Sequence, residues 1–133
     1  MSELSAPPPR AIVAGHAEFA TGLVSAVDAI TGLGDALVTL EVKGLCSQEI
    51  HALMRDTLVR TRTRVIFTDL QAGSCTMAAR RVLREAGDVV LICGTNLPML
   101  LDFVLSTESD PVVAATHAVE RGRAAVSLTG GTP

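Results

Sequence analysis

The sequence predicts an α/β protein, a three-layer sandwich in which a mostly parallel sheet of five strands carries helices on both faces. Two observations carry this prediction. Short apolar runs of the kind that buried strands produce alternate with longer segments whose apolar residues recur at helical spacing. Four such strand-to-helix alternations fill ~100 residues, and neighbouring parallel strands need crossover helices to connect them.

One domain over residues 10–133 is expected, after a flexible, proline-rich leader over residues 1–9. A chain of 133 residues has room for a single domain, and 48% apolar residues suffice for its core. The leader contains three consecutive prolines, which favour an extended and mobile segment.

The first half of the chain contains two predicted strand-helix pairs. An apolar run predicts a strand over residues 10–14, and apolar residues at helical spacing predict a helix over residues 17–32. Residues 36–42 alternate loosely as the second strand. Residues 47–60 then return to the helical spacing.

The second half begins with a third strand, predicted over residues 64–70. A helix follows over residues 74–86, and Ser74 is well placed to cap its first turn. Residues 89–93 form the fourth apolar run and predict the fourth strand.

Two start signals predict the last two helices. Asn96 is a favourable N-cap, and Pro98 is tolerated in the first turn that follows it. Asp110 followed by Pro111 is a strong helix start. The short apolar run over residues 124–128 is expected to form the fifth strand.

Charge and aromatic content argue against nucleic acid as a partner. Acidic residues number 14 against 11 basic ones, so the net charge is −3 and a basic footprint is lacking. Aromatic residues make up only 2% of the chain, which leaves few platforms on which bases would stack.

The distribution of apolar residues and cysteines predicts a cytoplasmic protein without direct membrane insertion. No apolar run reaches the ~18 residues of a membrane span, and the N-terminus does not read as a secretory signal. The three cysteines show no CxxC spacing, so neither a disulfide framework nor a zinc site is expected.

Residues capable of chemistry follow three of the predicted strands. They are Gly15-His16, residues 69–74 and residues 94–96. Ligands and catalytic groups of open α/β sheets collect at the carboxyl ends of the strands, near the point where the strand order switches. We therefore expect the functional site to be built from these segments.

His16 is the leading candidate for a catalytic residue. A histidine without a partner is more often an ordinary loop residue. If strands one and three are neighbours, as in flavodoxin-like strand order, Asp69 can hydrogen-bond one ring nitrogen and leave the other exposed. Asp69 taken alone would more often be a turn residue.

Gly73 and Ser74 open a predicted helix, whose free backbone N–H groups suit a phosphate, although a simple serine N-cap is the plainer interpretation. Walker, GxGxxG and GxSxG patterns are absent, which disfavours nucleotide-dependent kinases, dinucleotide oxidoreductases and serine hydrolases.

Cys75 prompts a reactive-thiol hypothesis, because a helix start lowers the pKa of a thiol. His51 and His117 fall inside predicted helices and are expected at the surface.

Three stretches are far more specific together than any one of them alone. They are Gly15-His16-x-x-Phe19-Ala20-x-Gly22, Thr68-Asp69-Leu70-x-Ala72-Gly73-Ser74 and Gly94-Thr95-Asn96-Leu97-Pro98-Met99-Leu100-Leu101. In order and spacing they resemble the mannose/fructose/sorbose family of phosphotransferase-system (PTS) enzyme IIA domains.

The resemblance implies a cytoplasmic phosphotransferase that needs no cofactor. The histidine matching His16 accepts phosphate from the phosphocarrier HPr and passes it to a IIB component for sugar uptake. The aspartate matching Asp69 hydrogen-bonds the other ring nitrogen, and the turn matching Gly73 and Ser74 lies beside the phosphoryl group. The resemblance also implies a homodimer, in which the strand at residues 124–128 is antiparallel or exchanged between subunits.

The chain departs from the family pattern around the expected site. Ala17 replaces a usual glycine, Cys75 a usual proline and Met77 a usual asparagine. His16 and Asp69 are intact, so phosphoryl acceptance is still expected, whereas IIB docking and the sugar class stay open. Two alternatives also stay open: a stand-alone regulatory protein whose output is the phosphorylation state of the histidine, and the phosphotransfer subunit of dihydroxyacetone kinase.

Overall fold

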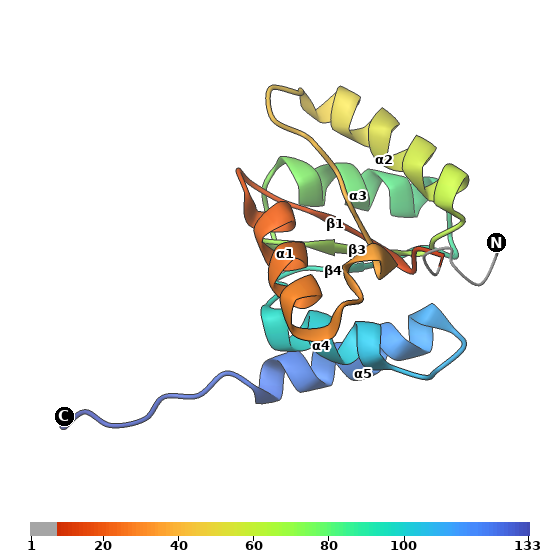
Figure 1. Cartoon of the computed structure of the whole chain (residues 1–133). Coiled ribbons are helices and arrows are strands. Elements are labelled where there is room, and N and C mark those ends of the chain that lie inside the picture. Colours follow the sequence, from red (N-terminus) through yellow and green to blue (C-terminus); the bar gives the residue numbers. More distant parts are fainter. Residues whose placement is uncertain (1–7) are drawn as a thin grey trace.

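The structure is a computed structural model that describes residues 8–133, in which a parallel sheet lies between two layers of helices (Figure 1). Its strands are β1 (Ala11–Ala14), β2 (Leu37–Thr39), β3 (Val65–Thr68) and β4 (Val90–Ile92). Its helices are α1 (Phe19–Thr31), α2 (Ser47–Thr61), α3 (Ser74–Glu85), α4 (Leu97–Leu105) and α5 (Pro111–Ala124), and a 3-10 turn, η2 (Gly34–Ala36), precedes β2. The predicted α/β sandwich is confirmed.

The strand order places the first strand in the middle of the sheet. The order is β2-β1-β3-β4, and all neighbouring strands are parallel. Because the chain goes from β1 to one side and returns to β3 on the other, the order switches between these two strands. Ala14 pairs with Thr68 at their ends, so β1 and β3 stop side by side.

The central strands divide their side chains between two cores, because successive strand residues face opposite sides of the sheet. Ala11 and Val13 of β1 belong to the core under α1, α4 and α5. Ile12 and Ala14 belong to the core under α2 and α3. Figure 1 shows these two helix layers on opposite faces. All four β1 residues are buried, which accounts for the continuous apolar run in the sequence.

Two of the predicted helix caps are confirmed and one is wrong. The side chain of Asn96 accepts the N–H of Met99 at 3.0 Å, and that of Asp110 accepts the N–H of Val112 at 2.9 Å. Ser74 is not a cap, since α3 begins at Ser74 itself and its N-cap is Gly73. Gly73 has a φ of 119°, which residues other than glycine rarely adopt. The N-cap therefore lies one residue earlier than expected.

The fifth strand predicted at residues 124–128 is wrong, and the sheet within residues 8–133 has four strands. The helix α5 ends at Ala124, the first residue of this segment, and its C-cap follows, where the N–H of Ala125 donates to the carbonyl of Arg121 at 3.0 Å. The chain then leaves the body of the protein (Figure 1), with Val126 and Leu128 exposed by 74% and 94%. Of the leader expected at residues 1–9, residues 1–7 lie outside the described part of the chain.

His51 is buried, which corrects the prediction that it lies at the surface. Its ring lies between α2 and α3, where Nε2 is 2.7 Å from Oε1 of Glu85. The hydrogen bond lowers the pKa of Glu85 below its ordinary value, helped by the nearby charges of Arg55 and Arg81. His117 is exposed, as predicted.

Candidate functional site

The ends of β1 and β3 bring two of the predicted residues together. His16 follows β1 by two residues, and Asp69 comes directly after β3. Because the two strands are parallel neighbours in register, both residues leave the sheet at the same edge. This edge is the switch point of the strand order, where ligands of such sheets bind.

One carboxylate oxygen of Asp69 holds His16 in two ways. Asp69 Oδ2 lies 2.6 Å from the ring Nδ1 of His16 and also accepts the backbone N–H of His16 at 2.8 Å. The carboxylate side chain is 9% exposed and the imidazole 58% exposed. The pair therefore has its acidic partner inside and its ring facing solvent, which is the arrangement that the sequence predicts.

The ionised form of Asp69 is favoured despite its burial. Burial is the largest influence and raises the pKa of Asp69, but the hydrogen bonds from the backbone and ring of His16, together with the charge of that ring, outweigh it. The net effect holds the pKa of Asp69 below its ordinary value. An ionised carboxylate accepts only, so in the neutral form of His16 the ring proton belongs on Nδ1 and the lone pair on Nε2.

Two glycines allow close approach of backbone around this pair. A Cβ on Gly15 would lie 2.9 Å from Cγ of Asp69 and 2.6 Å from the ring of Phe19, so a side chain has no room there. A Cβ on Gly73 would lie 3.1 Å from Cε1 of His16. The backbone that begins α3, at Gly73 and Ser74, therefore lies directly beside the imidazole.

A cleft of about 430 Å³ opens in front of the ring. Its walls come from the turn after β1, the loop after β2 and the start of α3, with the lining residues Gly15, His16, Ala17, Glu18, Val42, Lys43, Gly44, Leu45, Ser74 and Cys75. The loop after β2 was not among the three predicted segments. This loop also follows the carboxyl end of a strand, where ligands of open α/β sheets collect, so the same expectation covers it.

The third predicted segment, residues 94–96, does not line the cleft. Thr95 is buried, and its hydroxyl donates to the carbonyl of Thr68 at 2.8 Å. Asn96 caps α4 and donates from Nδ2 to the carbonyl of Gly122 at 2.9 Å. These residues hold the end of β3 and join α4 to α5, so their contribution is to the scaffold.

Cys75 does not have the environment of a reactive thiol, which corrects that hypothesis. The residue is 2% exposed, and burial followed by the negative charge of Asp69 raises the pKa of its thiol. A metal centre also lacks ligands, because no three His, Cys, Asp or Glu residues cluster within residues 8–133.

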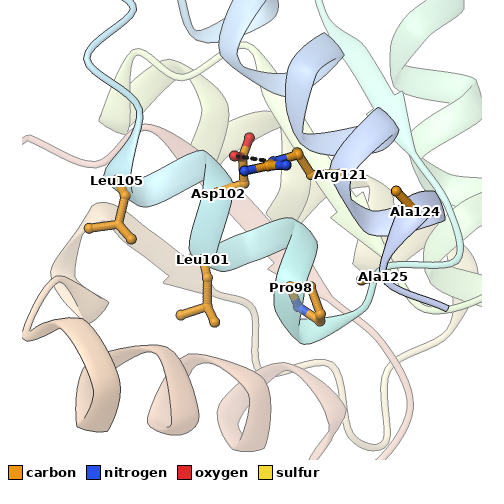
Figure 2. A pocket seen from close by; sticks show the side chains of 7 residues that line it. All are labelled: Pro98, Leu101, Asp102, Leu105, Arg121, Ala124 and Ala125. Carbon is orange, nitrogen blue, oxygen red and sulfur yellow. Dashed lines mark ion pairs between the residues drawn. The ribbon is translucent and has the colours of Figure 1, made fainter. Parts of the chain in front are cut away.

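A second cavity of about 410 Å³ lies between α4 and α5 (Figure 2). Figure 2 shows Asp102 paired with Arg121 beside the apolar side chains of Leu101 and Leu105. Nε of Arg121 lies 3.5 Å from Oδ1 of Asp102. The lining of this cavity contains no histidine, serine or cysteine. No helix in the described part of the chain has the length and apolar character needed to cross a membrane.

Residues 10–120 match the family described as PTS system fructose IIA component. The chain belongs to this family. The PTS IIA family has a phosphotransfer role in the sugar phosphotransferase system and works with HPr and IIB components. A search of curated proteins found no match.

Solved structures of PTS IIA proteins share the fold. The mannose/sorbose specific IIA subunit of Enterococcus faecalis is 19% identical, with a TM-score of 0.76 over 96% of this chain and 98% of its own. The EIIA component of Streptococcus agalactiae is 20% identical, with a TM-score of 0.78 over 89% and 95%. The PTS IIA protein associated with the fucose utilization operon of Streptococcus pneumoniae is 20% identical, with a TM-score of 0.73 over 94% and 96%.

Proposed function

We propose that this PTS IIA protein is a phosphoryl carrier, which accepts a phosphoryl group from phospho-HPr on Nε2 of His16 and passes it to a IIB component for sugar uptake. The observation that carries the proposal is the 2.6 Å contact between Nδ1 of His16 and Oδ2 of Asp69. That contact supports a ring proton on Nδ1, with Nε2 as the nucleophile in an imidazole that is 58% exposed.

The transfer needs little covalent machinery. Nε2 attacks the phosphorus in line, and the bond to the donor nitrogen breaks as the new N–P bond forms. The ring of His16 becomes positively charged, and the ionised Asp69 stabilises that charge through Nδ1–H. Backbone N–H groups at the start of α3, beside Gly73 and Ser74, are placed to donate to the phosphoryl oxygens. The second transfer reverses these steps toward IIB.

The domain organisation, location, oligomeric state, partners and cofactor requirement also belong to this proposal. Residues 10–133 work as one IIA domain, and the protein acts in the cytoplasm as a homodimer, as its resemblance to PTS enzyme IIA domains implies. Its partners are HPr and a IIB component, and the reaction uses no cofactor.

A phosphorylation assay tests the acceptor. Incubation with phosphoenolpyruvate, enzyme I and HPr is expected to add one acid-labile phosphate, measured by intact mass at neutral and acidic pH. His16→Ala should abolish the label. His117→Ala removes an exposed helical histidine, and this variant should still take up the label. Comparison of the two variants controls for nonspecific labelling. Label retained in His16→Ala would overturn the assignment.

The acceptor step of the proposal has a separate test. The phosphorylated protein is mixed with purified IIB components, and transfer of the label is followed over time. Transfer to a IIB supports the carrier role. A phosphorylated protein that transfers to none of them would favour the regulatory alternative.

A further inference from the structure

The cleft in front of His16 contains a single basic side chain apart from the imidazole, that of Lys43. Two acidic side chains surround the ring: Glu18 lines the same cleft, and Asp69 lies behind the ring. A phosphoryl group on Nε2 adds up to two negative charges to this setting. Without a cation nearby, the modified ring would face like charges only, which disfavours the phosphorylated state.

Lys43 is held at the tip of an ordered turn. The N–H of Leu45 donates to the carbonyl of Val42 at 3.0 Å, which closes a four-residue turn with Lys43 at its second position. Gly44 follows at the third position with a φ of 81°, in the left-handed region that glycine adopts readily. Val42 and Leu45 pack against the core under α2 and α3, so both ends of the turn are anchored.

The ammonium group of Lys43 is uncommitted in the described part of the chain. It takes part in none of the ion pairs there, and its side chain is exposed. Arg80, a basic residue in the middle of α3, directs its guanidinium to the carbonyl of Gln71 and does not line the cleft. Lys43 is also the only lysine in the sequence, whose other basic side chains outside histidine are all arginines.

We propose that Lys43 is a phosphoryl-binding residue whose ammonium group pairs with the phosphoryl oxygens on Nε2 of His16. The inference rests on the proposed function, since it concerns the phosphorylated form of the same ring. The four-carbon stem gives the ammonium the reach and freedom to meet the group when it arrives. Lys43 forms and breaks no covalent bond. It stabilises the phosphorylated state and thereby sets how much of the protein carries phosphate at equilibrium with HPr.

The single lysine permits a direct spectroscopic test. Reductive methylation with ¹³C-formaldehyde labels Lys43 and the N-terminal amine, and Lys43→Arg identifies which signal is which. His16 is then loaded with phosphoramidate in a His117→Ala background, so that the test does not depend on HPr. The dimethyl-lysine signal is expected to move on loading, and to stay in place in His16→Ala. A His16 that is fully phosphorylated while the lysine signal stays in place would overturn the proposal.

The equilibrium with HPr supplies the second readout. Lys43→Met is expected to lower the equilibrium constant for transfer from phospho-HPr by about threefold to fivefold, the range of an exposed charge pair. Lys43→Arg should restore it, because the charge is kept. Arg84→Met removes an exposed cation from the far end of α3 and serves as the matched control. Equal equilibrium constants for Lys43→Met and the wild type would also refute phosphoryl binding by Lys43.

The two proposals can fail separately. If phosphoramidate phosphorylates His16 but phospho-HPr does not, the proposed function fails, while the lysine signal still decides whether Lys43 binds the phosphoryl group.

Discussion

A single oxygen atom, Oδ2 of Asp69, contacts both the backbone and the ring of His16. It accepts the backbone N–H and lies against Nδ1 of the same residue, at 2.8 Å and 2.6 Å. The backbone contact holds the main chain of His16 in place. The ring contact engages Nδ1 and leaves Nε2 without a contact to Asp69. Rotation of the imidazole would break the second contact, so the orientation of Nε2 is restrained before any phosphoryl donor arrives.

Asp69→Asn tests this restraint. The amide keeps an oxygen that can accept from His16, but it removes the negative charge that stabilises the developing imidazolium. We expect the rate of phosphoryl acceptance from HPr to fall by roughly 10²-fold, the lower end for a positioned acid-base partner. Rapid-quench kinetics measures the rate. Asp102→Asn, on an acid paired with Arg121 away from the cleft, should leave it unchanged. A wild-type rate in Asp69→Asn would remove the carboxylate charge from the mechanism.

Sequence reasoning at the residue scale succeeded where strand register decides the outcome. The proximity of His16 and Asp69 follows from two strand ends and one assumption about strand order. It failed where a side chain has two plausible environments. Cys75 lies in the first turn of a helix, which favours a thiolate, but it is also part of the core under α2 and α3, and burial prevails. His51 lies three residues before the buried Met54, so the helical spacing itself indicated a core position.

At the scale of elements, the junction between β1 and α1 contains a strained residue. Ala17 has a φ of 46°, in the left-handed region that favours glycine. It lies inside the turn that the N–H of Phe19 closes on the carbonyl of His16 at 2.9 Å. The departure from the glycine usual at this place in the family therefore has a conformational cost, and the hydrogen bonds around His16 hold the turn in place.

Ala17→Gly and Ala20→Gly form a matched pair that measures this strain. Relief of the left-handed conformation, worth ~1 kcal/mol, offsets the extra chain entropy of glycine at position 17. We expect the free energy of unfolding to stay the same or rise slightly. Ala20 is buried in the first turn of α1, where a glycine should lower the free energy of unfolding by about 1 kcal/mol. Urea titrations compare the two, and an equal loss in both variants would mean that Ala17 is unstrained.

Element boundaries were predicted best where a capping side chain marks them. Asn96 and Asp110 begin α4 and α5 as expected, because an oxygen that accepts a backbone N–H leaves a local signature. The fifth strand had no such signature. A stretch of five residues that are apolar except for Ser127 is compatible with a strand or with the end of a helix, and its pattern alone does not distinguish the two.

At the scale of the whole molecule, the depressed pKa of Asp69 couples the site to folding. The unfolded chain titrates this carboxyl near the ordinary value of about 3.9. Folding lowers the pKa, so the ionised carboxylate adds to stability above that pH, and the contribution is lost as the pH falls through the lower folded value. The strand pairing that creates the site is thereby stabilised by the site itself.

Unfolding measured across pH checks this coupling. The difference in the free energy of unfolding between the wild type and Asp69→Asn is expected to be largest above about pH 4 and to shrink on further acidification. Glu49 and Glu85, whose pKa values are also lowered, are present in both proteins and cancel in the difference. Urea titrations from pH 3 to pH 6 supply the data. A difference that grows as the pH falls would reverse the assigned direction.

The 53 residues that separate His16 from Asp69 have a consequence for the newly made chain. While the polypeptide leaves the ribosome, His16 emerges with no carboxylate to orient it, because β3 does not yet exist. Its ring becomes an oriented nucleophile only after Thr68 has paired with Ala14. Under the proposed function, efficient loading with phosphate would therefore report that the centre of the sheet has assembled, and partly folded chains would draw little phosphate away from HPr.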